Sequence, residues 1–269
     1  MTVTDSIISG NTAGNSGGGI NNDGTMTVSG CTLDDNSATY GGGGIVTIGP
    51  VTISGTTLSG NHAQQGGGIA NLSAASKTGD VEGQLTVSGC TLSDNHALRG
   101  GGIYNQTGTT GWLKVTSDSV TGISVLSGNS ASYGGGIFVE CGVVSVCGTN
   151  FSNNTATVDG AGIDVSPGDS YYLATVTISG CILSGNVASQ SGGGIYVTSS
   201  GSGSVSMTVD GCKLYGNAAT AGNGGGIFNN SSGTLTVSNS AFGNPLTNTP
   251  DDISGAYVDG GGNSFPPLI

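Results

Sequence analysis

Leu58-Ser-Gly-Asn-His-Ala-Gln-Gln-Gly-Gly-Gly-Ile69 carries a pattern that runs through the chain, and Leu92-Ser-Asp-Asn-His-Ala-Leu-Arg-Gly-Gly-Gly-Ile103 repeats it. The pattern is Leu-x-x-Asn, followed eight to ten residues after the asparagine by an isoleucine behind glycines. The asparagines of the copies are Asn11, Asn36, Asn61, Asn95, Asn129, Asn154, Asn186 and Asn217. The matching isoleucines are Ile20, Ile45, Ile69, Ile103, Ile137, Ile163, Ile195 and Ile227. Self-similarity at this spacing is typical of solenoid proteins, whose repeats stack on one another.

Positions counted from each asparagine separate the inside of a coil from its outside, because side chains alternate along a strand. Ten and eight residues upstream stand apolar pairs such as Met26 with Val28, Val51 with Ile53, Leu85 with Val87, Val176 with Ile178, and Met207 with Val209. Alanine stands two residues after all eight asparagines. Cys31, Cys90, Cys181 and Cys212 lie five residues before an asparagine and are predicted to be small core residues. These positions define the inward face of each coil.

Short strands separated by glycines, with no helical period, predict an all-β parallel β-helix of about nine coils. Its corners would be formed by glycines with positive φ and by asparagines whose side-chain amides bond from one coil to the next. We expect a single domain over residues 1–269, with regular coils over 1–234 and an irregular last coil and C-terminal cap over 235–269. In that last copy Phe242 takes the leucine place and the asparagine is out of register.

Composition excludes several other classes of protein. The 269 residues include 54 glycines, only 6 prolines and 7% charged residues, with a net charge of −12. So much glycine argues against helices, and the absence of a Gly-X-Y period argues against collagen. The acidic balance makes nucleic acid and anionic membranes poor partners. No apolar run is long enough for a transmembrane helix and Met1–Asp5 shows no signal peptide, so we expect no membrane insertion of this segment and export through sequence outside this chain.

The repeat resembles that of a known family. Gly-Gly-Gly-Ile with Leu-x-x-Asn, and once Phe151-Ser-Asn-Asn154, is similar to the GGxI and FxxN repeat of the chlamydial polymorphic outer membrane proteins and related bacterial β-helix surface proteins. The resemblance implies a right-handed β-helix exposed on, or released from, a bacterial surface, where relatives act as adhesins. It implies no catalytic residue. The predicted function is therefore that of a non-catalytic structural or adhesive segment of a larger extracellular or cell-surface bacterial protein.

Aromatic residues mark the predicted binding surface. The extra residues of the long coils fall between the isoleucine strand and the next apolar strand, at 73–84, 106–118, 166–174 and 198–206, so these loops should emerge along one side. Trp112, Tyr171 and Tyr172 lie on the loops, and Tyr104, Phe138, Tyr196 and Phe228 follow the isoleucine and point outward. They could bind a glycan or a protein of a host or neighbouring cell. Alternatively, the loops fold back over the rings as satellite hydrophobic clusters.

An enzyme acting on polysaccharides is the alternative function, since β-helices often carry lyases and hydrolases. Hydrolysis needs two facing carboxylates, and almost none of the acidic residues stack on adjacent coils, so no catalytic residue is assigned. His62 and His96 should stack on the outer surface, as a weak metal site, a pH-sensitive pair or two solvent-facing turn residues. No metal site and no cofactor are predicted.

Three further expectations concern the surface and the ends. Cys141 and Cys147 could close a local disulfide in an exported protein. An outward threonine column would suit ice binding but is interrupted at Val120 and Ser145; its members are Thr2, Thr27, Thr52, Thr86, Thr177, Thr208 and Thr236. The strands near Thr2 should form an uncovered edge, which would allow end-to-end self-association or a filament, whereas the proline-containing C-terminus should cap the other end.

Overall fold

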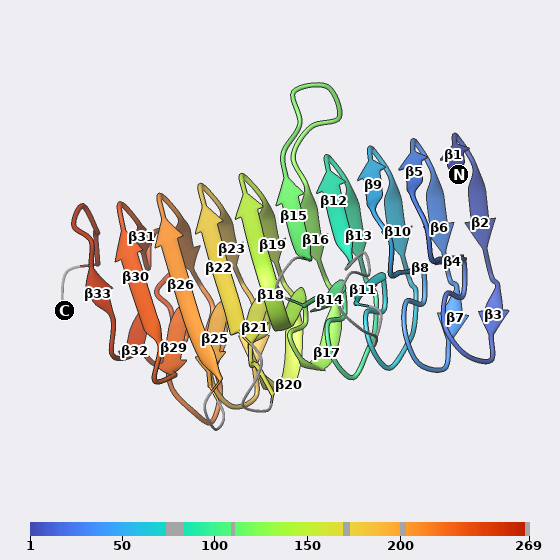
Figure 1. The fold of residues 1–269 in the computed structure, drawn as a ribbon. Helices are drawn as coiled ribbons and strands as arrows, with labels where there is room; N and C mark the ends of the chain where they lie inside the picture. The colour runs from blue at the N-terminus through green and yellow to red at the C-terminus, as the bar shows by residue number, and fades with distance from the viewer. Residues whose placement is uncertain (74–82, 109–110, 169–172, 200–202, 267–269) are drawn as a thin grey trace.

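The computed structural model describes residues 1–73, 83–108, 111–168, 173–199 and 203–266. Within these ranges all regular structure is β-strand, and the strands pair in parallel from one coil to the next (Figure 1). No helix in this part of the chain has the length and apolarity required to cross a membrane.

Four stacks of strands form the coil walls, and we name them sheets A to D in chain order. Sheet A contains β1 (Thr2–Thr4), β5 (Met26–Ser29), β9 (Val51–Ser54), β12 (Gln84–Ser88), β15 (Trp112–Thr116), the second half of β18 (Ile137–Cys147), β22 (Leu173–Ser179), β26 (Ser204–Asp210), β30 (Thr234–Ser238) and β33 (Val258–Asp259). Sheet B contains β2 (Ile7–Ser9), β6 (Thr32–Asp34), β10 (Thr57–Ser59), β13 (Thr91–Ser93), β16 (Val125–Ser127), β19 (Asn150–Ser152), β23 (Ile182–Ser184), β27 (Lys213–Tyr215) and β31 (Ala241–Phe242).

The two remaining walls are sheets C and D. Sheet C contains β3 (Thr12–Ala13), β7 (Ser37–Ala38), β17 (Ser130–Tyr133), β20 (Thr155–Asp159), β24 (Val187–Ala188) and β28 (Ala218–Ala219), and single bridges at His62 and His96 connect its two parts. Sheet D contains β4 (Ile20–Asn22), β8 (Ile45–Thr47), β11 (Ile69–Leu72), β14 (Ile103–Gln106), the first half of β18, β21 (Ile163–Val165), β25 (Ile195–Thr198), β29 (Ile227–Asn230) and β32 (Ile253–Gly255).

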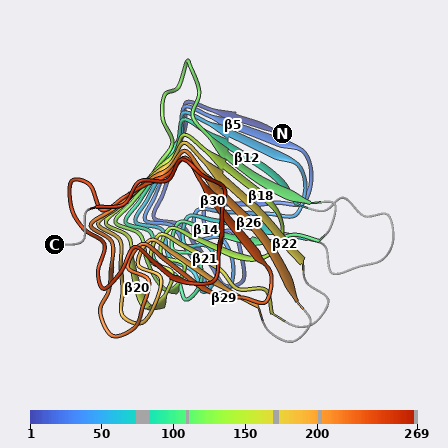
Figure 2. The same cartoon turned by 90° about the vertical axis from the view of Figure 1, so that its left-hand side faces the viewer.

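The coils wind as a right-handed parallel β-helix. Figure 2 looks from the C-terminal end, and in it the chain climbs sheet A to the apex, descends sheet B and returns along sheet D while advancing toward the viewer. In the part of the chain that the structure describes, sheet B has nine strands, one for each complete coil. The predicted fold class and the number of coils are therefore confirmed.

Identical side chains stack inside the coil. Leu33, Leu58 and Leu92 lie in register across sheet B, and Ile45, Ile69 and Ile103 do so across sheet D. All six are fully buried in one continuous core cluster. Because a coil alone has no partner for this apolar face, stacking supplies the stability of the array.

The asparagines form a ladder of hydrogen bonds along the whole stack. The Asn129 Oδ1 accepts bonds from the Asn95 backbone N (3.1 Å) and Nδ2 (3.0 Å), while its Nδ2 donates to the Asn154 Oδ1 (3.0 Å) and the Leu92 carbonyl (2.9 Å). The last copy also joins this ladder, since the Asn217 Nδ2 donates to the Asn248 Oδ1 at 2.9 Å. A longer turn after Phe242 brings Asn248 into the register that the sequence spacing lacks.

Glycine is required where consecutive coils approach most closely. Gly100 has a φ of +66°, and a Cβ on Gly101 would lie 2.5 Å from the Gly135 carbonyl oxygen of the next coil. A side chain at either position would strain the corner or push the coils apart. The glycine run therefore leaves a strip without side chains between sheets C and D.

One predicted insertion lies elsewhere. Leu113 and Val115 pair with Leu85 and Val87, so the extra residues of this coil include a hairpin, Asp118–Gly122, that follows sheet A instead of preceding it. This hairpin projects at the apex between β15 and β16 (Figure 1), and Val120 at its tip is 90% exposed. Lys114, not Val120, interrupts the threonine column.

The cysteine predictions have two outcomes. Cys31, Cys90, Cys181 and Cys212 are buried, as predicted for core residues. The disulfide between Cys141 and Cys147 is wrong, because Cys147 is a free, exposed thiol. Both lie on β18, where the extended run from Gly142, next to Cys141, to Cys147 rises by five residue steps, about 16 Å. A disulfide requires Cα atoms about 4.4–6.8 Å apart.

The first and last coils differ. Among the described residues, β1, β2 and β3 pair with other strands on one side only, and Ile7 is largely exposed. At the other end Phe265 stacks on Phe242 with ring centroids 5.0 Å apart. Self-association through the first coil stays a prediction.

Candidate functional site

The residues that follow the isoleucines form one outward-facing row across sheet D. We call this row the outer column; its members in register are Asn21, Val46, Ala70, Tyr104, Phe138, Asp164, Tyr196, Phe228 and Ser254. Four of the seven predicted binding residues, Tyr104, Phe138, Tyr196 and Phe228, thus lie in a single row. Asp164 divides them into two pairs.

The first pair is buried, which contradicts the predicted exposure. Tyr104 is 0% exposed and Phe138 is 4% exposed, and their rings stack at 5.7 Å. Leu72 and Tyr133 pack against them, so the rings belong to a satellite hydrophobic cluster, which was the alternative interpretation. The Tyr104 hydroxyl donates to the Glu140 carboxylate, and burial, followed by this bond, raises the pKa of Tyr104. Tyr104 cannot contact a ligand in this arrangement.

The second pair remains accessible. Tyr196 and Phe228 stack with ring centroids 5.5 Å apart, and each is partly exposed. The other three predicted residues do not join them. Trp112 lies on β15 in sheet A, in register with Gln84 and Val143, whereas Tyr171 and Tyr172 lie outside the described residues.

Asp164, between the two pairs, is fully buried. The Ser166 hydroxyl donates to its Oδ1, while its Oδ2 has no hydrogen-bond partner in the described part of the chain. Burial raises the pKa of this carboxyl well above its ordinary value, against a smaller lowering by Ser166. Burial therefore favours the neutral acid over the carboxylate at this position.

A second row runs beside the outer column, on the other side of the glycine strip. Gln65, Arg99, Tyr133 and Asp159 directly precede or flank the glycine runs and follow one another across sheet C. Because the glycines between the rows carry no side chains, residues of both rows meet above the strip. Sequence reasoning missed this second row, although its position before each glycine run was a usable signal.

The two rows enclose a pocket at the corner between sheets C and D. We call it the Arg99 pocket; it is lined by Arg99, Tyr133, Phe138, Asp159, Ser166, Pro167, Gly168, Tyr196 and Thr198. It thus brings two of the predicted residues, Phe138 and Tyr196, together with a cation and a carboxylate. Such a mixture of aromatic walls and few polar groups is typical of ligand pockets.

The charged residues of the Arg99 pocket differ in how they are bonded. The Arg99 guanidinium lies 5.7 Å from the centroid of the Phe138 ring, and no hydrogen bond or ion pair joins it to the described residues. The Asp159 Oδ1 accepts a hydrogen bond from the Ser191 backbone N at 2.8 Å. Burial raises the pKa of Asp159, and this bond partly opposes the shift. Arg99 thus keeps its donors available.

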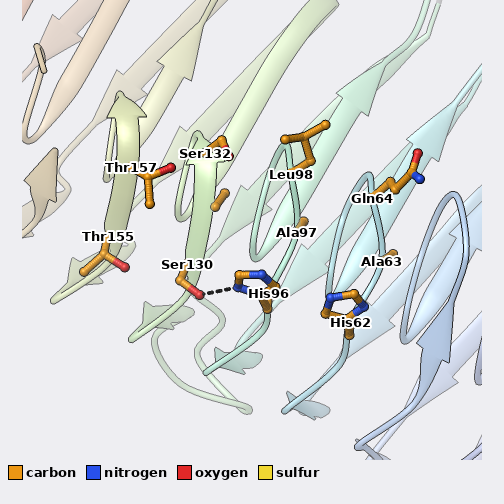
Figure 3. Close-up of a pocket in the computed structure, with 11 residues that line it drawn as sticks. His62, Ala63, Gln64, His96, Ala97, Leu98, Ser130, Ser132, Thr155 and Thr157 are labelled. Carbon is orange, nitrogen blue, oxygen red and sulfur yellow. Dashed lines mark hydrogen bonds between the residues drawn. The ribbon is translucent and has the colours of Figure 1, made fainter. Parts of the chain in front are cut away.

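A second hollow lies on the outer face of sheet C (Figure 3). The rings of His62 and His96 stack there at 5.2 Å with 19° between their planes, as predicted, and the His96 Nδ1 lies 2.8 Å from the Ser130 Oγ. Burial, and then the neighbouring His62, lower the pKa of His96.

Stacked imidazoles are poorly arranged to share a metal ion, because their nitrogen lone pairs lie in nearly parallel planes and do not converge. Among the residues that the structure describes, no group of three or more His, Cys, Asp or Glu side chains could hold a metal. The hollow is instead lined by small and neutral side chains, including Ala63, Ala97 and Ser132.

These features define a parallel β-helix repeat protein with a pocket on one corner. Comparison with known proteins agrees: residues 180–198 match the family model of the Chlamydia polymorphic membrane protein repeat. The matched residues include β23, β24 and β25 with the ladder residue Asn186, and the resemblance seen in the sequence is confirmed for this repeat. Neither the curated proteins nor the solved structures give a match.

Proposed function

We propose that this chain is a non-catalytic, adhesive β-helical segment of a larger bacterial surface protein. The match to a membrane protein repeat supports a surface location. The continuous core and the asparagine ladder support a rigid scaffold. Its partner is a glycan or a glycoprotein on a host or neighbouring cell, bound through the C–D corner.

One observation carries the adhesive role: the Arg99 pocket adjoins the accessible Tyr196–Phe228 pair. Aromatic faces bind the apolar faces of sugar rings and anchor protein contacts. Elsewhere on sheet D the outward aromatic rings are covered, so this pair is where the outer column can meet a partner.

The same geometry disfavours the alternative, an enzyme that cleaves polysaccharides. Hydrolysis requires two carboxyl groups that both reach the scissile bond. Asp159 lines the pocket, but Asp164, within the outer column, is fully buried. A single accessible carboxylate supports binding better than hydrolysis.

The threonine column supports ice binding less well than the C–D corner supports adhesion. Thr2, Thr27 and Thr52 are in register on the exposed face of sheet A, but Lys114 and Ser145 break the column at its middle. A charged side chain there prevents a continuous flat array.

The test is the binding of the purified chain to cultured host cells and to a glycan array. We expect binding to fall at least about tenfold when Tyr196→Ala is combined with Phe228→Ala, since anchoring aromatic residues each carry roughly 1–2 kcal/mol or more. Thr27→Ala with Thr52→Ala, on sheet A, is the matched control and should bind like the unmodified chain. Equal binding by both double variants would refute the adhesive surface, and release of unsaturated or reducing ends from a bound glycan would favour the enzyme.

A further inference from the structure

We propose, on the basis of the adhesive function above, that the Arg99 pocket binds a sugar bearing one carboxylate at the end of an otherwise neutral glycan. The repeat pattern does not specify this ligand. Arg99, Tyr133 and Asp159 occupy equivalent positions in successive coils, yet each is a different residue type.

Arg99 supplies the site for the carboxylate. Its side chain is half-buried, and within the described chain it contacts the Phe138 face but makes no ion pair. Arginine is rarely buried without a partner, and its planar donors match a carboxylate in a bidentate pair. Stacking on Phe138 holds the guanidinium plane in place, so a ligand carboxylate meets donors that are already oriented.

The other pocket walls fit a sugar ring. Tyr196 presents a partly exposed ring, and burial together with the nearby Asp159 and Asp164 raises the pKa of its hydroxyl. That hydroxyl therefore stays protonated and can donate or accept a hydrogen bond. Asp159 can accept a bond from a sugar hydroxyl or amide through its Oδ2, because the Ser191 amide bonds to its Oδ1. A sugar that carries hydroxyl groups beside one carboxylate would therefore match the hydrogen-bonding groups of Arg99, Tyr196 and Asp159.

Charge restricts the ligand to a single carboxylate. The chain has a net charge of −12 with four cationic residues. Lys114 lies on sheet A and Lys213 on sheet B, so neither shares the C–D corner with Arg99, and Lys77 lies outside the described residues. A polyanion would meet Asp159 and the acidic surface after its first contact with Arg99. A terminal carboxylated sugar avoids this repulsion.

Isothermal titration with 3′-sialyllactose, its methyl ester and lactose tests the proposal directly. The methyl ester keeps the ring and removes the charge. We expect 3′-sialyllactose to bind at least about tenfold more tightly than the ester or lactose, the usual value of a charge-assisted hydrogen-bond pair. Arg99→Gln should abolish this difference and Arg99→Lys should retain part of it. Lys213→Gln removes the same charge from sheet B and should leave binding unchanged.

Each other outcome overturns the inference. Equal binding of lactose and 3′-sialyllactose would show a neutral-sugar site and leave the adhesive function standing. Tighter binding of heparin would show a polyanion site. Loss of cell binding in the Tyr196 and Phe228 variant without any glycan binding would indicate a protein partner. Absence of both cell and glycan binding would refute the proposed function as well. Circular dichroism of Arg99→Gln and Arg99→Lys checks folding, and the ester comparison on the unmodified chain needs no variant.

Discussion

The asparagine ladder inside the coil and the outer column of sheet D are both rows of one residue per coil, yet they obey different rules. The ladder repeats one residue type, from Asn36 to Asn248, and buries every member. The outer column changes residue type at nearly every coil and is buried at Tyr104 but accessible at Tyr196. Stacking alone determines the environment of the first row. The second depends on what covers each position.

The cover comes from residues that no repeat pattern identifies. Leu72 and Tyr133 pack over Tyr104 and Phe138, and the Arg99 guanidinium lies over the Phe138 ring. The repeat thus builds the scaffold, and the residues beside the glycine runs give each coil its individual surface. Substitutions in the two rows should therefore have different effects on stability. The expected loss is largest in the asparagine ladder and smallest at the accessible end of the outer column.

The largest effect is expected inside the coil, for Asn129→Ala. The Asn129 side chain makes four hydrogen bonds to Asn95, Leu92 and Asn154, and its loss would leave buried polar groups of both adjacent coils without partners. We expect the free energy of unfolding to fall by about 5 kcal/mol or more, since each buried polar group left without a partner costs roughly 1–3 kcal/mol, and urea denaturation measures the loss. Asn11→Ala, at the exposed first coil, is the control and should cost roughly 1 kcal/mol or less. Similar losses in the two variants would contradict a cooperative ladder.

The next effect concerns the outer column where it is buried. Tyr104→Ala should cost about 3–5 kcal/mol, because the ring is fully buried against Phe138 and its hydroxyl bonds to Glu140. Tyr104→Phe removes only that bond and should cost less. A loss near zero for the alanine variant would mean that the outer column is exposed at this coil, as the sequence pattern indicates.

The sequence predicts the interior well and the outer surface poorly, for one physical reason. Leu92, Asn95 and Ala97 recur at fixed spacing, and parallel stacking places like side chains in contact, so their burial follows from the repeat. Whether an outward ring is covered depends on side chains outside the repeat pattern, such as Leu72 of sheet D and Tyr133 of sheet C. The insertion after β15 escaped prediction because Ser117–Ile123 has no repeat-specific pattern, so the spacing alone does not tell on which side of the strand the extra residues lie.

A moderate, pH-dependent effect on stability is expected for Asp164→Asn, at the position that divides the buried aromatic pair of the outer column from the accessible pair. The folded protein raises the pKa of this buried carboxyl, so its protonated form adds stability below the unfolded pKa, near 4, and that stability is lost as pH rises through the folded pKa. The asparagine variant does not titrate. It should therefore be more stable than the unmodified chain at pH 8, by about 1 kcal/mol or more.

Thermal unfolding from pH 4 to pH 8 measures this difference, which should shrink toward pH 4. Asp23→Asn, at an exposed position, is the matched control and should follow the unmodified chain throughout. A parallel pH dependence of the Asp164→Asn variant and the unmodified chain would show that Asp164 is ionised in the fold and has a partner.

The smallest effect on stability is expected where the outer column is accessible, for Tyr196→Ala. The Tyr196 ring stacks on Phe228 but is partly exposed, so its truncation removes far less buried area than that of Tyr104. We expect a loss of roughly 1 kcal/mol or less in urea denaturation. Binding to cells or glycan should nevertheless fall strongly, whereas Tyr104→Phe should retain it, because Tyr104 lies beneath the surface. Two residues of one type, in one row, would then separate cleanly into a folding role and a binding role. If Tyr196→Ala destabilises the chain as much as Tyr104→Ala, the ring is covered and the C–D corner offers no aromatic surface to a partner.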